Sequence, residues 1–299
     1  MHEIWPNFFL VGAAKAGTTS IYTYLSQHPD VFFPVIKEPH FFTQVHPAPE
    51  QRFLIEAITK RRAYLRLYAD AARHNVIGDA SPSYLWHPEV PQRIRAQVPQ
   101  AKVAIILRDP IERAHSHYLM DFREGGQSRP FYEALLEDMN RSEKGWGVSY
   151  LYYELGLYAK QVQRYLETFR TERVKVLMFE DFRRDPKAVL YEIAAFLGLD
   201  PQPFAQIDTS RKYNSYAAPR NHVLRRLAGA KISRILGNTI IPRRLGAFIF
   251  EQIFLKPAAK PPLDPRAHEL LRTLYGPALD QLEKLLDRQL PELRRSWNG

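Results

Sequence analysis

The chain has 299 residues, of which 45% are hydrophobic and 25% charged, a composition that excludes a disordered protein and is ordinary for a globular enzyme. Its 42 lysines and arginines exceed its 32 aspartates and glutamates, and the formal net charge of +10 indicates an anionic ligand or surface. It contains no cysteine, which excludes disulfides, thiolate metal sites and a cysteine nucleophile.

The first predicted element is a strand that leads into a glycine-bracketed loop. The apolar run Phe8–Val11 precedes Gly-Ala-Ala-Lys-Ala-Gly-Thr-Thr-Ser at residues 12–20, and apolar spacing from Ile21 onward indicates a helix. This arrangement directs backbone N–H groups and a helix dipole at an anion, usually a phosphate. In the nucleoside triphosphate version the lysine directly follows the second glycine, whereas Lys15 lies two residues before Gly17. We predict a phosphate site of another kind; the alternative is a tight turn with a solvated lysine.

A second phosphate site is predicted further along the chain. The apolar strand Val103–Leu107 ends on Arg108, and a proline two residues later favours the start of a helix. An arginine at a strand end can clamp a phosphate with two hydrogen bonds, and Ser116, two turns along the helix, can add a hydroxyl. The alternative for this arginine is a local ion pair with Asp109 or Glu112.

Strand and helix patterns alternate along the rest of the chain. Short, continuously apolar strands between helices predict a single α/β domain with a central, mainly parallel sheet flanked by helices. Ligands of such sheets bind beyond the carboxyl ends of the strands. A proline-rich stretch at residues 256–265 predicts a surface crossing before the last helix. The further predicted elements are strands at Val76–Gly78 and Val174–Phe179, and helices at 131–139, 158–169, 189–197 and 271–286.

These motifs resemble those of sulfotransferases that use 3′-phosphoadenosine 5′-phosphosulfate (PAPS). The loop with Lys15 resembles their 5′-phosphosulfate loop, and Arg108 with Ser116 eight residues later resembles their 3′-phosphate motif. The sequence Lys-Glu-Pro-His-Phe-Phe at residues 37–42 resembles the K-E-x-x-F-F element of the heparan sulfate-type and related bacterial enzymes. The order of segments after residue 156 also resembles the family, so that the likeness covers nearly the whole chain. Residues 222–265 are the least similar part.

The resemblance implies which residues hold the donor. Its 3′-phosphate is assigned to Arg108 and Ser116. Arg211 and Lys212 lie where relatives close a basic loop over the nucleotide, and the alternative is a solvated pair of charges. The residues implied for the 5′-phosphosulfate are Lys15, Ala16, Gly17, Thr18, Thr19 and Ser20.

The resemblance also implies the groups that carry the chemistry. Glu38 is implied as the general base that takes the proton of the acceptor. Lys15 is implied as the positive charge that stabilises the leaving phosphate. His40 is the alternative base, because its ordinary pKa is nearer neutrality and cytosolic sulfotransferases of small molecules use a histidine.

We predict a PAPS-dependent sulfotransferase, one domain over residues 1–299 with a fold that resembles the P-loop nucleotide kinases. It would transfer a sulfuryl group to a hydroxyl or amine of a carbohydrate, lipid or natural product and release 3′-phosphoadenosine 5′-phosphate (PAP), without a metal. The alternatives are an ATP-dependent phosphotransferase of the P-loop kind and a non-catalytic protein for anionic ligands; no nucleic-acid module is recognisable. A kinase needs a lysine after the second glycine and a Mg²⁺-binding aspartate after a strand. Here Thr18 and Arg108 occupy those positions.

Three further features concern the acceptor and the location. Ala80 replaces a lysine of the heparan sulfate enzymes, which weighs against a sulfated glycosaminoglycan as acceptor. Residues 222–265 are predicted as a helical cap, in which residues 222–256 mix basic and apolar residues at helical spacing. That pattern fits a cap with a solvated basic face or a surface that binds an anionic bilayer. No secretory signal or membrane-spanning apolar run is recognisable, and we expect a cytoplasmic, bacterial protein.

Overall fold

The computed structural model describes residues 3–44, 57–123, 126–142, 151–209, 217–219 and 255–298. Arg211 and Lys212 lie outside these residues, and so do residues 222–254 of the predicted cap. The choice between a solvated basic face and a surface that binds a bilayer therefore stays untested. Among the helices that are described, none is both long and apolar enough to cross a membrane.

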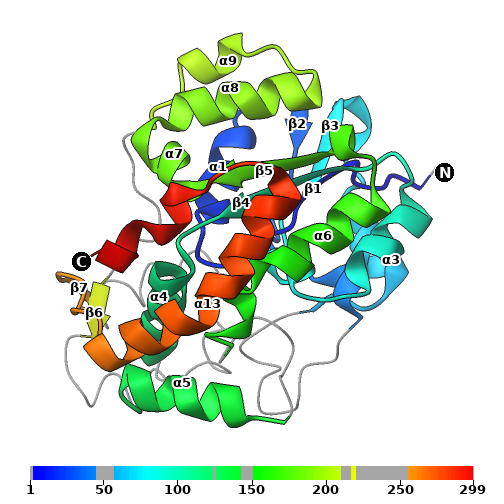
Figure 1. The fold of residues 1–299 in the computed structure, drawn as a ribbon. Helices are drawn as coiled ribbons and strands as arrows, with labels where there is room; N and C mark the ends of the chain where they lie inside the picture. Colours follow the sequence, from blue (N-terminus) through cyan, green and yellow to red (C-terminus); the bar gives the residue numbers. More distant parts are fainter. Residues whose placement is uncertain are drawn as a thin grey trace.

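A parallel sheet of five strands forms the centre of the domain (Figure 1). Its strand order is β2-β3-β1-β4-β5, and in its register Phe9 lies opposite both Asp79 and Val103. All neighbouring strands are parallel, so their carboxyl ends meet at one edge. The α/β fold expected from the sequence is therefore confirmed. The strands are β1 (Phe8–Leu10), β2 (Val31–Phe32), β3 (Val76–Asp79), β4 (Lys102–Leu107) and β5 (Val174–Met178).

Helices cover both faces of this sheet (Figure 1). Helices α1 (Thr18–Leu25) and α8 (Pro186–Leu197) lie on one face, and α3 (Val90–Gln97), α6 (Tyr158–Thr168) and α13 (Pro265–Leu286) on the other. Because the sheet is covered on both sides, its central strand β1 has no exposed face, and Phe8, Phe9 and Leu10 are all fully buried. The other α-helices are α2 (Arg61–Arg66), α4 (Pro110–Arg123), α5 (Phe131–Asn140), α7 (Phe179–Arg184) and α9 (Gln202–Ala205).

The ends of several elements differ from the predictions by a few residues; α8 and α13, for example, begin earlier than predicted. Three further differences are local. Strand β5 ends at Met178, one residue early, because Phe179 already begins α7 and its ring packs over the glycine loop. Strand β2 was not predicted, since two residues carry no periodicity. The proline-rich segment begins with strand β7 (Leu255–Pro257), which pairs antiparallel with β6 (Ala217–Pro219).

Candidate active site

The glycine loop lies between β1 and α1, at the carboxyl edge of the sheet. Gly17 precedes α1 with φ 88°, in the left-handed region, and a Cβ there would lie 2.9 Å from the Phe179 ring. Glycine is therefore required by both the backbone and the space. No side chain of the described residues caps α1, and its first turn holds no acid. Its first N–H groups and the positive end of its dipole are thus available to an anion.

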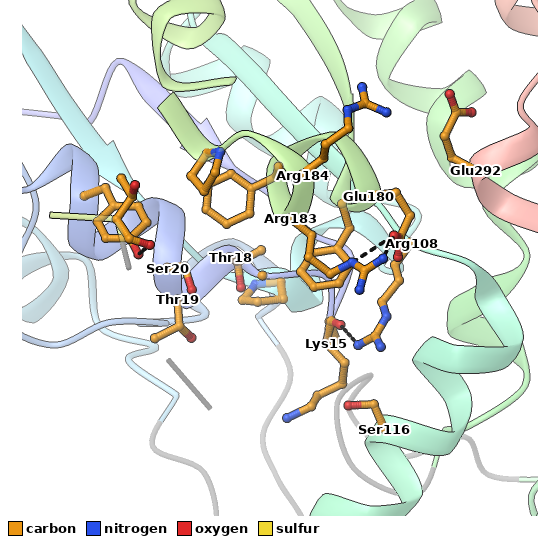
Figure 2. A pocket seen from close by; sticks show the side chains of 18 of the residues that line it. Lys15, Thr18, Thr19, Ser20, Arg108, Ser116, Glu180, Arg183, Arg184 and Glu292 are labelled. Carbon is orange, nitrogen blue, oxygen red and sulfur yellow. Dashed lines mark hydrogen bonds and ion pairs between the residues drawn. The ribbon is translucent and has the colours of Figure 1, made fainter. Parts of the chain in front are cut away.

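The predicted donor residues line one cavity of about 1730 Å³. Figure 2 shows Lys15, Arg108 and Ser116 around the same space, with Thr18, Thr19 and Ser20 at the start of α1. Ala16, which is part of the loop, is fully buried and does not line this cavity. The predicted residues that line it are Lys15, Gly17, Thr18, Thr19, Ser20, Glu38, Arg108 and Ser116.

Arg108 makes the local ion pair that was the alternative reading, and it also lines the cavity. Its guanidinium donates to Glu112 Oε2 at 2.9 Å and to the carbonyl oxygen of Lys15 at 3.1 Å. Its Cζ lies 4.7 Å from the centroid of the Phe179 ring, a cation–π arrangement. These contacts fix the guanidinium beside the glycine loop, where an incoming phosphate could compete with the glutamate.

Glu38 and His40 lie in very different environments. The Glu38 side chain lines the cavity, is 32% exposed, and accepts a hydrogen bond from Lys37. Burial would raise the pKa of its carboxyl, but the charges of Lys37, His40 and Lys15 outweigh this and hold the pKa below its ordinary value. Glu38 is thus ionised at neutral pH.

His40 is only 4% exposed and is not among the residues that line the cavity. Its Nδ1 lies 2.7 Å from Ser83 Oγ, and its Nε2 lies 3.8 Å from Glu38 Oε2. Burial lowers the pKa of the imidazole to about 4, which leaves it neutral at neutral pH. An acceptor in the cavity therefore meets Glu38 before it could meet His40.

Sequence reasoning missed several charged residues of this cavity. Arg183 and Arg184 lie on α7, which begins directly after β5, so their place after a strand could have identified them. Lys260 had no comparable signal; partial desolvation and then the charge of Arg108 lower the pKa of its ammonium. The cations lining the cavity are Lys15, Arg108, Arg123, Arg183, Arg184, Lys187, Lys260 and Arg295, against the acids Glu38, Glu180, Asp208 and Glu292.

Two aspartates lie where strands end at this edge, but both are engaged away from the cavity. Asp109 accepts hydrogen bonds from the amides of Ile111 and Glu112 and from Ser296. Asp79 accepts from three hydroxyl groups. Within the described ranges, no group of three or more acidic or histidine side chains is arranged to hold a metal ion.

Comparison with known proteins gives one consistent family. Residues 6–227 match the sulfotransferase domain. The chain is 27% identical over 247 residues to carbohydrate sulfotransferase 15 of Rattus norvegicus, a match that covers 66% of this chain and 44% of that protein. It is 30% identical over 195 residues to heparan sulfate glucosamine 3-O-sulfotransferase 3B1 of Mus musculus, covering 65% and 46%. The chain thus matches less than half the length of these relatives.

Solved structures show the same likeness over almost the whole chain. A sulfotransferase from Alicyclobacillus acidocaldarius shares 31% identity and superposes with a TM-score of 0.73, covering 97% of this chain and 99% of that one. A mouse sulfotransferase in complex with PAP shares the fold at 15% identity, with a TM-score of 0.51 over 92% of this chain and 84% of that one.

Proposed function

Since the chain belongs to the sulfotransferase family, we propose that it transfers the sulfuryl group of PAPS to a hydroxyl of an acceptor and releases PAP. The observation that carries this proposal is that one cavity, lined by described residues, joins the start of α1, Arg108 with Ser116, and Glu38. A donor with phosphates at both 5′ and 3′ positions needs two anion sites at one sheet edge. The excess of cations in the cavity suits such a donor.

The proposed reaction uses three groups of this chain. The acceptor oxygen attacks the sulfur of PAPS, and the bond from sulfur to the oxygen of the 5′-phosphate breaks. Glu38, ionised and inside the cavity, accepts the proton of the acceptor. Lys15 and the first turn of α1 stabilise the charge that develops on the leaving phosphate. His40, buried and neutral, is the weaker candidate for the base.

We propose a carbohydrate hydroxyl as the acceptor, an amine being the other nucleophile expected from the sequence. The support is that two of the relatives are, by their names, a carbohydrate and a heparan sulfate glucosamine sulfotransferase. Ala80, which replaces the lysine of the heparan sulfate enzymes, is 2% exposed and does not line the cavity. The acceptor would therefore be held without that positive charge.

Ligand stabilisation tests the donor against the kinase alternative. PAP at about 100 times its dissociation constant should stabilise the folded protein by about 2.7 kcal/mol, and its thermal unfolding midpoint should rise by several degrees. ATP with Mg²⁺ should raise it much less, because it lacks the 3′-phosphate and the two aspartates at the sheet edge are already engaged. Equal stabilisation by both nucleotides would contradict the proposal.

Replacing Arg108 by alanine should weaken PAP binding much more than binding of adenosine 5′-phosphosulfate, which lacks the 3′-phosphate. A charge-assisted bidentate contact implies a loss of roughly 2–3 kcal/mol for PAP. Isothermal titration with both ligands measures the difference. Glu112→Gln is the matched control, because it removes the ion pair but keeps the guanidinium, and PAP should bind it at least as tightly as wild type. If Arg108→Ala weakens both ligands equally, Arg108 has only a structural role.

A further inference from the structure

A fully buried carboxylate lies directly behind the loop that carries Glu38. Asp79, the last residue of β3, has no exposed surface and does not line the cavity. Its Oδ2 accepts hydrogen bonds from Tyr64 Oη at 2.7 Å and Tyr84 Oη at 2.9 Å, and its Oδ1 accepts one from Ser81 Oγ at 2.7 Å. A buried charge is costly unless donors surround it. Three hydroxyl groups of the chain are arranged to supply them.

Two of these three hydroxyls also hold the backbone of the Glu38 loop. The amide of His40 donates to Ser81 Oγ, and the amide of Phe42 donates to Tyr84 Oη, both at 3.3 Å. A hydroxyl has one proton. Because each of these hydroxyls donates its proton to Asp79, its lone pairs are left for the loop amide. The ionised carboxylate therefore fixes the direction of the hydrogen bonds on both paths, from the amide to the hydroxyl and from the hydroxyl to Asp79.

The loop needs such support, because its backbone is strained. Glu38 has φ 64° and His40 has φ 55°, both in the left-handed region that residues other than glycine rarely adopt. Such residues persist where the surrounding structure holds them in place. The two supported amides belong to His40 itself and to Phe42, two residues beyond it.

We propose that Asp79 is a positioning residue for Glu38: through Ser81 and Tyr84 it holds the loop that carries the base. The proposal rests on the proposed role of Glu38 as the general base. Asp79 would touch neither donor nor acceptor. Its effect is to keep the carboxylate of Glu38 aimed into the cavity while the acceptor loses its proton.

The arrangement predicts a dependence on pH. Burial raises the pKa of Asp79 to about 6. A protonated Asp79 must donate a hydrogen bond, so at least one hydroxyl has to turn and give up its present bond. Turnover should therefore fall as the pH drops through about 6, above the range in which Glu38 itself, whose pKa is lowered, takes up a proton. The titratable groups that face Asp79 are Tyr64, Tyr68, Tyr84, Tyr165 and Glu38.

The test compares variants that each remove one hydroxyl. Tyr84→Phe and Ser81→Ala each break one connection between Asp79 and the loop. Tyr64→Phe is the matched control, since it removes a donor to the same Asp79 oxygen as Tyr84→Phe but no contact with a loop amide. Hydrogen exchange of the amides of His40 and Phe42 is measured in the presence of PAP. Turnover is measured as PAP release from PAPS, with water as a slow acceptor.

The expected result separates positioning from stability. Ser81→Ala and Tyr84→Phe should each lower kcat about tenfold, the scale of one lost hydrogen bond. Each should also speed exchange of its own loop amide, while KM for PAPS stays unchanged. Well above pH 6, Tyr64→Phe should lower only the thermal midpoint. Because the hydrogen bond that is lost lowers the pKa of Asp79 in the wild type, the fall in turnover should start at a higher pH in this variant. In Asp79→Asn the amide does not titrate. Turnover of this variant should be lower than that of the wild type well above pH 6, and it should show no fall near pH 6.

Two outcomes would overturn parts of this account separately. If Ser81→Ala and Tyr84→Phe match Tyr64→Phe in both exchange and kcat, Asp79 only stabilises the fold. If Glu38→Gln keeps its turnover, Glu38 is not the base and the proposed mechanism fails, whereas the exchange measurement still decides whether Asp79 holds the loop.

Discussion

Lys15→Ala should lose turnover by about 10²- to 10³-fold, the scale seen when one preorganised stabiliser of developing charge is removed. The side chain of Lys15 lines the cavity beside the start of α1, and its Nζ lies 3.3 Å from Met120 Sδ. Its removal takes a positive charge away from the leaving phosphate. The substitution keeps the backbone carbonyl that binds Arg108, so the second phosphate site should remain in place.

The measurement is PAP release from PAPS, together with the dissociation constant of PAP. Lys175→Ala is the matched control, because it removes the same unit of charge from β5, where the lysine pairs with Glu192 and does not line the cavity. It should turn over like the wild type. Near-normal kcat in Lys15→Ala would show that this lysine does not act on the leaving group, and the proposed mechanism would have to be abandoned.

Glu38→Gln should lower kcat by about 10²-fold or more, as expected for a lost general base, with almost no change in PAP affinity. The amide keeps the size of the side chain but cannot take up the proton. His40→Ala should have a smaller effect on kcat, because the histidine is buried and neutral, and its backbone amide, which the loop uses, is retained.

The same assay decides between the two residues. The kcat of both variants is compared at neutral pH, where Glu38 is ionised because positive neighbours outweigh its burial. A large loss in His40→Ala beside a small loss in Glu38→Gln would reverse the roles. Equal and small losses would mean that neither group takes the proton.

Features that depend on neighbouring residues could be predicted from the sequence alone. The strand before the glycine loop, the helix after that loop and the start of α4 at Pro110 all follow from short-range patterns, and the structure confirms them. Helix α5 was likewise predicted, because apolar spacing is a local property. The family could be inferred because its motifs are short stretches of sequence, and the α/β fold because strand and helix patterns alternate along the chain. The roles of the site residues stay predictions until they are tested.

Features that join distant segments required the tertiary structure. The pattern at residues 37–42 gave Glu38 as the base and left His40 open as the alternative. Burial now distinguishes them, since the fold brings Ser83 against the histidine and leaves the glutamate in the cavity. Arg295 and Lys260 reach the cavity from segments far along the chain.

The support for the Glu38 loop is of the same kind. Asp79 lies about forty residues from the loop in sequence and is joined to two of its backbone amides through Ser81 and Tyr84. No pattern in the sequence marks such a connection. The sequence by itself determined the local elements and their order, because periodicity and turn chemistry act between near neighbours. The tertiary structure decided which charges share the cavity and which carboxylate is buried behind it, because burial depends on what packs against each side chain.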